Sequence, residues 1–166
     1  MYCAPVTILG ASGTKCPLDG KFATLLEYGI LASARDPFDP MEKAFHALGA
    51  ERLPAEQPPH NGRTLKWEYG LRPDLLAVTH VYELAGSPEL IVAAKGAPEA
   101  IAELCQLPKR DRAELGRGVD EMAQEGMRVL VVARASVPVW HPRRSPHSVF
   151  RSLLRHRWAY LPSEPG

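Results

Sequence analysis

The sequence predicts an α+β fold in which two helices precede an antiparallel meander with two interleaved helices. Apolar residues recur at helical spacing from residue 22, and apolar and polar residues alternate from residue 65. The connection Gly86-Ser87-Pro88 between two apolar segments is too short for parallel strands, so these strands must be antiparallel. A length of 166 residues with 45% hydrophobic residues suits one globular domain with a real core.

Two helices are expected in the first third of the chain. Asp19 is placed to cap the first, whose buried stripe is Phe22, Leu25, Leu26 and Ile30. Asp39 caps the second, with Pro40 at the first helical position and Glu42 at the third, an Asp form of the capping box. The stripe of this helix is Met41, Ala44, Phe45 and Leu48, and Gly49 is expected to end it.

Strands and helices alternate in the rest of the chain, after a loop over residues 51–62. Strands are predicted over residues 65–71, 76–84 and 90–94, and a nearly continuous apolar run predicts a central strand over 127–133. Pro98 opens one intervening helix. Asp111 with Glu114 predicts a capping box for the next helix, which Gly126 ends.

Composition excludes several classes of protein. A formal net charge of +1 argues against binding to nucleic acid or to an anionic membrane through the overall charge of the chain. No apolar run approaches the roughly 20 residues of a membrane-spanning helix, and the first 18 residues do not read as a signal peptide. The three cysteines (Cys3, Cys16 and Cys105) form no CxxC, and no histidine pair has metal-ligand spacing. We therefore expect a soluble chain of a reducing compartment with no metal site.

Composition also divides the chain into three segments. Residues 1–18 are irregular, residues 19–136 form the predicted domain, and residues 137–166 form a basic tail rich in proline and arginine. The tail holds five arginines, no lysine and one acid, which leaves residues 1–136 with a formal charge of about −3. We interpret the tail as a frameshifted or otherwise replaced end, or a disordered one. A basic interaction tail is the alternative.

Two basic residues stand where a ligand can come close. Lys95 ends an apolar strand and is followed by Gly96 and by the helix that begins at Pro98. Its positive charge therefore lies next to backbone that a ligand can approach closely, because glycine has no side chain. Arg128 has apolar neighbours on both sides, so its guanidinium must either reach solvent at the edge of the sheet or pair with an anion. The structural alternatives are a solvated lysine and a surface salt bridge. Residues 10–15 miss the spacing of a phosphate-binding loop.

Four blocks of sequence stand in a fixed order along the chain. They are Asp36-Pro37-Phe38-Asp39-Pro40-Met41-Glu42-Lys43-Ala44, Glu68-Tyr69-Gly70-Leu71, Lys95-Gly96-Ala97-Pro98-Glu99 with Cys105 downstream, and Gly126-Met127-Arg128-Val129-Leu130. Together they resemble the nucleotide-binding (N) domain of P-type cation-transporting ATPases. The third block is the most specific N-domain signature of that family, and the resemblance covers residues 22–135.

The resemblance implies a twisted antiparallel sheet flanked by helices that binds ATP, with Mg²⁺ only as part of the nucleotide complex. Glu42 would accept a hydrogen bond from the adenine amino group, a role that competes with the capping box, and Tyr69 would stack on adenine. Lys95 would line the deep end of the pocket, Gly96 would permit close approach, and Arg128 would reach the phosphates or ribose. The resemblance also implies a cytoplasmic location and the remaining domains of such an ATPase as partners, without nucleic acid or direct membrane insertion.

The sequence departs from the family in three ways. Asp74 stands where calcium-pump relatives carry a lysine, and the tail replaces the hydrophobic strand expected after Ala133. The phosphorylation motif Asp-Lys-Thr-Gly-Thr and the later magnesium motif are absent. We therefore expect a detached N domain that has no catalytic residues and does not hydrolyse ATP by itself. Two alternatives stay open: a structural or interaction domain that lost nucleotide binding, and a basic-tailed regulator of acidic partners.

Overall fold

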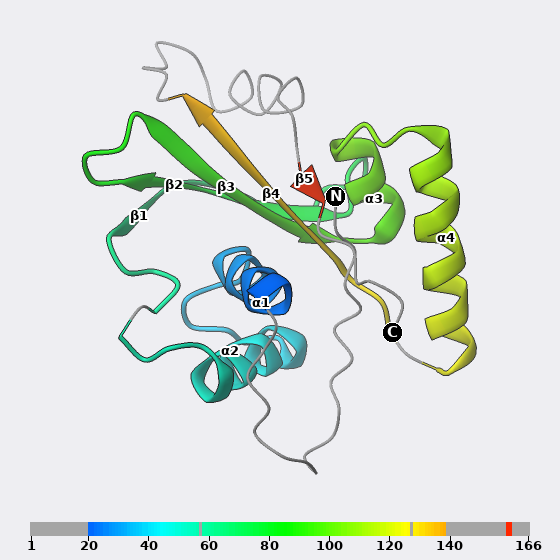
Figure 1. The fold of residues 1–166 in the computed structure, drawn as a ribbon, viewed down its shortest axis with the longest axis horizontal. Helices are drawn as coiled ribbons and strands as arrows, with labels where there is room; N and C mark the ends of the chain where they lie inside the picture. Colours follow the sequence, from blue (N-terminus) through cyan, green and yellow to red (C-terminus); the bar gives the residue numbers. More distant parts are fainter. Residues whose placement is uncertain (1–19, 57, 127, 139–158, 161–166) are drawn as a thin grey trace.

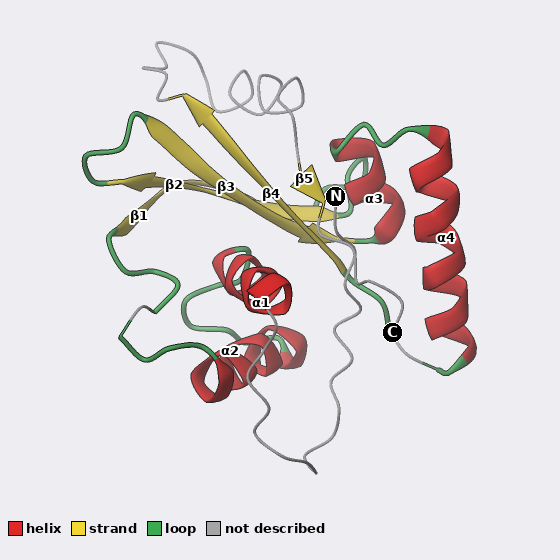
Figure 2. Cartoon of the chain, in the orientation of Figure 1, coloured by secondary structure: helices red, strands yellow, loops and turns green. Residues whose placement is uncertain are grey.

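A computed structural model describes residues 20–56, 58–126, 128–138 and 159–160 of the chain (Figure 1). The helices are α1 (Gly20–Leu31), α2 (Pro40–Arg52), α3 (Pro98–Leu104) and α4 (Lys109–Gln124). The strands are β1 (Arg63–Tyr69), β2 (Ala77–Leu84), β3 (Glu89–Gly96), β4 (Val131–Pro138) and the two-residue β5 (Ala159–Tyr160). The described part of the chain therefore has the α+β fold that the sequence predicts (Figure 2).

The strands form one antiparallel sheet in the order β1-β2-β3-β4-β5, so neighbours in the chain are neighbours in the sheet. Helices α1 and α2 pack on one face, and α3 and α4 pack on the other (Figure 1). Successive residues of a strand point to opposite faces: Tyr82 and Ala93 contact α1, whereas Val81 and Val92 share a core with α3 and α4. Because both faces are covered, most residues of the central strands β2 and β3 are buried, polar ones included.

The first two helices contain the predicted apolar stripes, with one correction to their boundaries; Asp19, the predicted cap of α1, lies outside the described residues. Asp39 caps α2, because its carboxylate accepts a hydrogen bond from the backbone N–H of Met41 at 2.8 Å. Gly49 does not end α2, contrary to the prediction, since the helix continues to Arg52. A Cβ on Gly49 would lie 2.3 Å from Ile30 Cδ1, so this glycine lets α1 and α2 approach each other closely.

Two later boundaries also differ from the predictions. Pro108 is the N-cap of α4, so Asp111 lies in the first turn instead of capping the helix, where its charge still favours the positive helix end. β4 begins at Val131, four residues later than the apolar run suggested. The end of α4 agrees with the prediction, because Gly126 has a φ of 75° and its N–H donates to the carbonyl of Ala123.

The sheet extends past the predicted domain boundary at residue 136. Val137 is buried and pairs with Leu90, and β5 pairs with β4 at Ala133 and Arg134. Two short parts of the predicted tail therefore belong to the sheet. The predicted irregular segment 1–18 and the rest of the tail lie outside the described residues. None of the helices in the described ranges is long and apolar enough to cross a membrane.

Candidate functional site

Lys95 places a buried positive charge at the end of β3. The residue is 7% exposed, and its Nζ donates hydrogen bonds to Ser33 Oγ and to Glu42 Oε1, each at 2.6 Å. The ammonium also lies 5.7 Å from the centroid of the buried Phe45 ring. Glu42 is on the first turn of α2, and Ser33 lies just beyond α1. Three parts of the chain thus meet at one ammonium, and we call Lys95, Glu42 and Ser33 the Lys95 corner.

The Glu42 carboxylate uses both of its oxygens at this corner. Oε1 accepts from Lys95, and Oε2 accepts from the backbone N–H of Ala34 at 3.3 Å. The carboxylate thus joins α2 to β3 and to the segment after α1, instead of returning to Asp39 as a capping box requires. The structure therefore has neither a capping-box contact for Glu42 nor a test of its predicted role at adenine; it has a contact with Lys95 that the sequence did not predict.

Burial determines the electrostatics of the Lys95 corner. Desolvation lowers the pKa of Lys95 from its ordinary value of 10.5, and the hydrogen bond from Lys95 to Glu42 opposes that shift. Ser33 Oγ donates to the carbonyl of Gly29 at 2.8 Å, so its lone pairs are available to the ammonium. The corner holds one cation and one carboxylate within hydrogen-bonding distance, which gives it both a donor and an acceptor.

Gly96 has a structural reason to be glycine. A Cβ at this position would lie 2.3 Å from the carbonyl oxygen of Leu76 and 2.6 Å from Cα of Ala77. The close neighbour of Gly96 is therefore the backbone at the start of β2. The structure gives no separate sign of the close ligand approach that the resemblance implies for this residue.

Tyr69 lies on the opposite face of the sheet from Lys95. It pairs with Thr79 and packs against the core that contains α3 and α4, and burial raises the pKa of its hydroxyl. A β-bulge between Leu65 and Trp67 causes this placement. Leu65, before the bulge, packs against the cluster that contains the end of α1, whereas Trp67, after the bulge, packs on the other face. In a regular strand, residues two positions apart share a face, so the bulge reverses the face for Trp67 and Tyr69.

Arg128 is exposed in the segment between α4 and β4. The first residue of β4, Val131, pairs with Gly96, so this segment enters the sheet at the end where Lys95 lies. Asp74, which stands where calcium-pump relatives carry a lysine, receives two hydrogen bonds from the Arg72 guanidinium at 2.9 and 2.7 Å. The structure brings Glu42, Lys95 and Gly96 together, brings the segment of Arg128 to the same end, and puts Tyr69 on the other face.

Sequence reasoning missed Ser33. Its hydroxyl contacts an ammonium 62 residues away in the chain, and no periodic pattern or motif links the two residues. A serine just after a helix is typical of an ordinary helix end, so the sequence offers no signal for this contact beyond the position of Ser33 three residues before the first resemblance block.

A second buried polar group holds the end of α1 against β2. The carbonyl of Leu31 accepts hydrogen bonds from His80 Nδ1 and from the hydroxyl of Tyr82, both at 2.8 Å. Burial lowers the pKa of His80, and it lowers the pKa of the neighbouring His60 to about 4. Within the described ranges, no three His, Cys, Asp or Glu side chains are grouped so that they could hold a metal ion.

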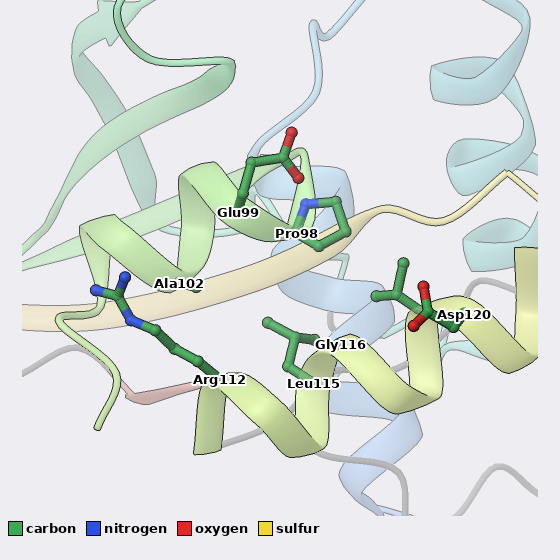
Figure 3. Close-up of a pocket in the computed structure, with 8 residues that line it drawn as sticks. Pro98, Glu99, Ala102, Arg112, Leu115, Gly116 and Asp120 are labelled. Carbon is green, nitrogen blue, oxygen red and sulfur yellow. The ribbon is translucent and has the colours of Figure 1, made fainter. Parts of the chain in front are cut away.

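A cavity of about 280 Å³ lies between α3 and α4 (Figure 3). Its lining combines small and apolar residues with three charged ones: Pro98, Ala102, Leu115, Gly116, Val119, Glu99, Arg112 and Asp120. Arg112 is held at one end, because its Nε donates to the carbonyl of Leu107 at 2.9 Å. The cavity lies on the face of the sheet opposite Lys95, and none of the predicted site residues lines it.

A comparison of the sequence with models of protein families finds no match, and a comparison with curated proteins finds none either. The choice between functions therefore depends on the residues and their geometry.

Proposed function

We propose that this chain binds an adenine nucleotide at the Lys95 corner, in the manner of the N domain of a P-type cation-transporting ATPase. The observation that carries the proposal is the Lys95 ammonium, buried at the end of β3 and bonded to Glu42 Oε1 at 2.6 Å. A cation beside a carboxylate offers a donor and an acceptor to the edge of a base, and the charge attracts phosphates. ATP is the proposed ligand, and Mg²⁺ enters only as part of the nucleotide complex.

The surroundings of the corner support a weak site. Arg128 belongs to the segment that leads into β4 at the same end of the sheet, where its exposed guanidinium is available to the phosphates or ribose. The ion pair between Arg72 and Asp74 reduces the repulsion that the carboxylate would otherwise exert on phosphates. We expect a dissociation constant near millimolar, about −4 kcal/mol. The four sequence blocks that resemble the ATPase family add the cytoplasmic location and the remaining ATPase domains as proposed partners.

Catalysis is not part of the proposal. The sequence has no Asp-Lys-Thr-Gly-Thr motif, so it lacks the aspartate that the family phosphorylates. After incubation with labelled ATP and Mg²⁺ and an acid quench, we expect the protein to carry no label. A stable acyl phosphate would show that another carboxylate has taken over that role.

A structural domain without nucleotide binding is the second candidate. Two observations favour it: protein groups already accept hydrogen bonds from Lys95, and Tyr69 lies on the other face of the sheet. Under this alternative the ion pair only holds α2 against β3, and no nucleotide perturbs the corner.

Nuclear magnetic resonance titration separates the two candidates. ATP added to the ¹⁵N-labelled chain should shift amide signals of Glu42, Gly96 and their neighbours, with saturation near the millimolar range. Lys95→Met should weaken ATP binding by roughly tenfold, because it removes the cation but keeps a long apolar side chain. Lys66→Met is the matched control, since Lys66 pairs with Glu83 on exposed strand positions away from the corner.

The proposal requires that the two lysine variants differ. If ATP up to about ten millimolar shifts no signals at the corner, nucleotide binding is wrong and the structural alternative holds. If Lys66→Met weakens binding as much as Lys95→Met, the effect is general electrostatics and not a site at Lys95.

A further inference from the structure

Phe38 is the most exposed aromatic residue in the described part of the chain. Its relative exposure is 94%, and the other large apolar residues that stand out in those ranges, Leu71 and Leu76, are aliphatic. Phe38 directly precedes Asp39, the N-cap of α2, so it stands next to the turn that carries Glu42. A single exposed aliphatic residue is common on protein surfaces, but an almost fully exposed phenyl ring next to the first turn of α2 needs an explanation.

Helix capping does not provide that explanation. A residue at the position of Phe38 often packs against the fourth helical residue and fixes the entry of the chain into the helix. Here the fourth helical residue is Lys43, and its Nζ lies 5.7 Å from the centroid of the Phe38 ring. The ring nevertheless keeps almost all of its surface in water, so the contact with Lys43 buries very little of it.

The position of Phe38 in the chain, four residues before Glu42, suits a role in stacking on a base. Glu42 lies next to Lys43 on the first turn of α2 and bonds to Lys95. Tyr69, the aromatic residue that the resemblance assigns to the base, is on the other face of the sheet. On the face that carries α2, an exposed ring is therefore available at Phe38 for a base whose edge reaches Glu42.

We propose that the nucleotide base stacks on Phe38 and that Lys43 contacts the phosphates. The inference rests on the proposed nucleotide binding and names the residues that would give it affinity. One face of the ring is approached by the Lys43 ammonium, and the other face is open to a base, as in other stacked contacts between bases and aromatic rings. Among the described residues Lys43 forms no ion pair with a carboxylate, so its charge is available to an anion.

Titrations with ATP and with adenosine test the two residues separately. Phe38→Ala should weaken both ligands by roughly five- to a hundredfold, because stacking acts on the base, whereas Phe38→Trp should preserve or tighten binding. Lys43→Gln should weaken ATP severalfold and leave adenosine unchanged, because adenosine has no phosphate. Lys109→Gln is the matched control: it removes the same charge from α4, on the opposite face, and should change neither affinity.

Thermal unfolding of the same variants excludes a folding effect. Phe38 is almost fully exposed, so Phe38→Ala should leave the unfolding midpoint within about a degree of the wild type. If the wild type binds ATP and Tyr69→Ala abolishes binding while Phe38→Ala does not, Phe38 is not the stacking residue, yet nucleotide binding stands. If the wild type binds no nucleotide at all, both the proposed function and this inference are wrong.

Discussion

Replacing Glu42 by alanine should destabilise the fold far more than replacing Lys95 by methionine. The two side chains form one ion pair, but their burial differs: the Lys95 side chain is 8% exposed and that of Glu42 is 19% exposed. Removing one partner of a buried ion pair is costly because the other charge stays in a medium of low polarity. The cost should therefore depend on which charge is left behind.

The contacts at the corner set the size of each effect. In Glu42→Ala the buried ammonium keeps Ser33 Oγ as its one acceptor among the described residues, so we expect a loss of about 2–4 kcal/mol, slightly below the range for fully buried pairs. In Lys95→Met the carboxylate keeps the N–H of Ala34 and is closer to solvent, so the loss should be about 0–1 kcal/mol. The double variant should resemble Lys95→Met, because no unpaired charge remains in the core.

Urea unfolding followed by far-ultraviolet circular dichroism at pH 7 and pH 9.5 measures these differences. Without Glu42 the pKa of Lys95 falls further below 10.5, so the unfolded chain binds a proton that the folded chain releases at high pH. The unfolding free energy of Glu42→Ala should thus recover relative to wild type as the pH rises. Equal losses in the two single variants, or a loss below about 1 kcal/mol for Glu42→Ala, would refute the reasoning.

Three further predictions concern the rest of the fold. Acid should destabilise the protein between pH 6.5 and about 4, because the pKa of His60 is about 4 in the folded state and 6.5 in the unfolded chain, which takes up the proton first. We expect the unfolding free energy to fall by about 1–2 kcal/mol over this range, after allowing for the partial exposure of His60. In urea unfolding at several pH values, His60→Gln should remove this pH dependence. Thr79→Val should stabilise by about 1 kcal/mol in equilibrium unfolding, because Thr79 Oγ1 is buried without a hydrogen-bond partner among the described residues and valine keeps its shape; a destabilised variant would indicate a partner for that hydroxyl. Gly118→Ala should raise the unfolding free energy by about 0.5–1 kcal/mol, since a Cβ there meets nothing within 4 Å inside α4, and an unchanged value would contradict the helix-propensity argument.

Local signals predicted most of the fold. The start of α2 was predictable because Asp39, Pro40 and Glu42 lie within one turn, and the hairpin between β2 and β3 was predictable because its turn is short. Gly49 misled the prediction because a glycine near a helix end has two explanations. Its sequence position suits a stop, whereas its contact with Ile30 belongs to the packing of α1 on α2, which only the folded structure contains.

Non-local geometry explains what the sequence did not predict at the candidate site. The alternation of Leu65, Trp67 and Tyr69 places all three on one face of an ideal strand, which would be the face of Lys95. The bulge between Leu65 and Trp67 reverses that assignment for Tyr69, and no residue in the segment marks its position. The contact of Ser33 with Lys95 likewise needs α1 to be docked on β3, which depends on the whole core.

Stability and nucleotide binding do not have to compete at Glu42, because its two carboxylate oxygens have different strengths of contact. Oε1 receives the 2.6 Å charge-assisted hydrogen bond from Lys95, whereas Oε2 receives a single backbone N–H at 3.3 Å, near the upper limit for such a bond. Under the proposed function, a base amino group that donates to Oε2 exchanges a weak contact for a better one and leaves the ion pair intact. Glu42→Gln then keeps an oxygen acceptor but loses the charge that fixes its orientation, so it should lower both the unfolding free energy and the affinity for adenosine. If Glu42→Gln lowers the stability and leaves adenosine binding unchanged, Glu42 holds the fold together and does not contact the base.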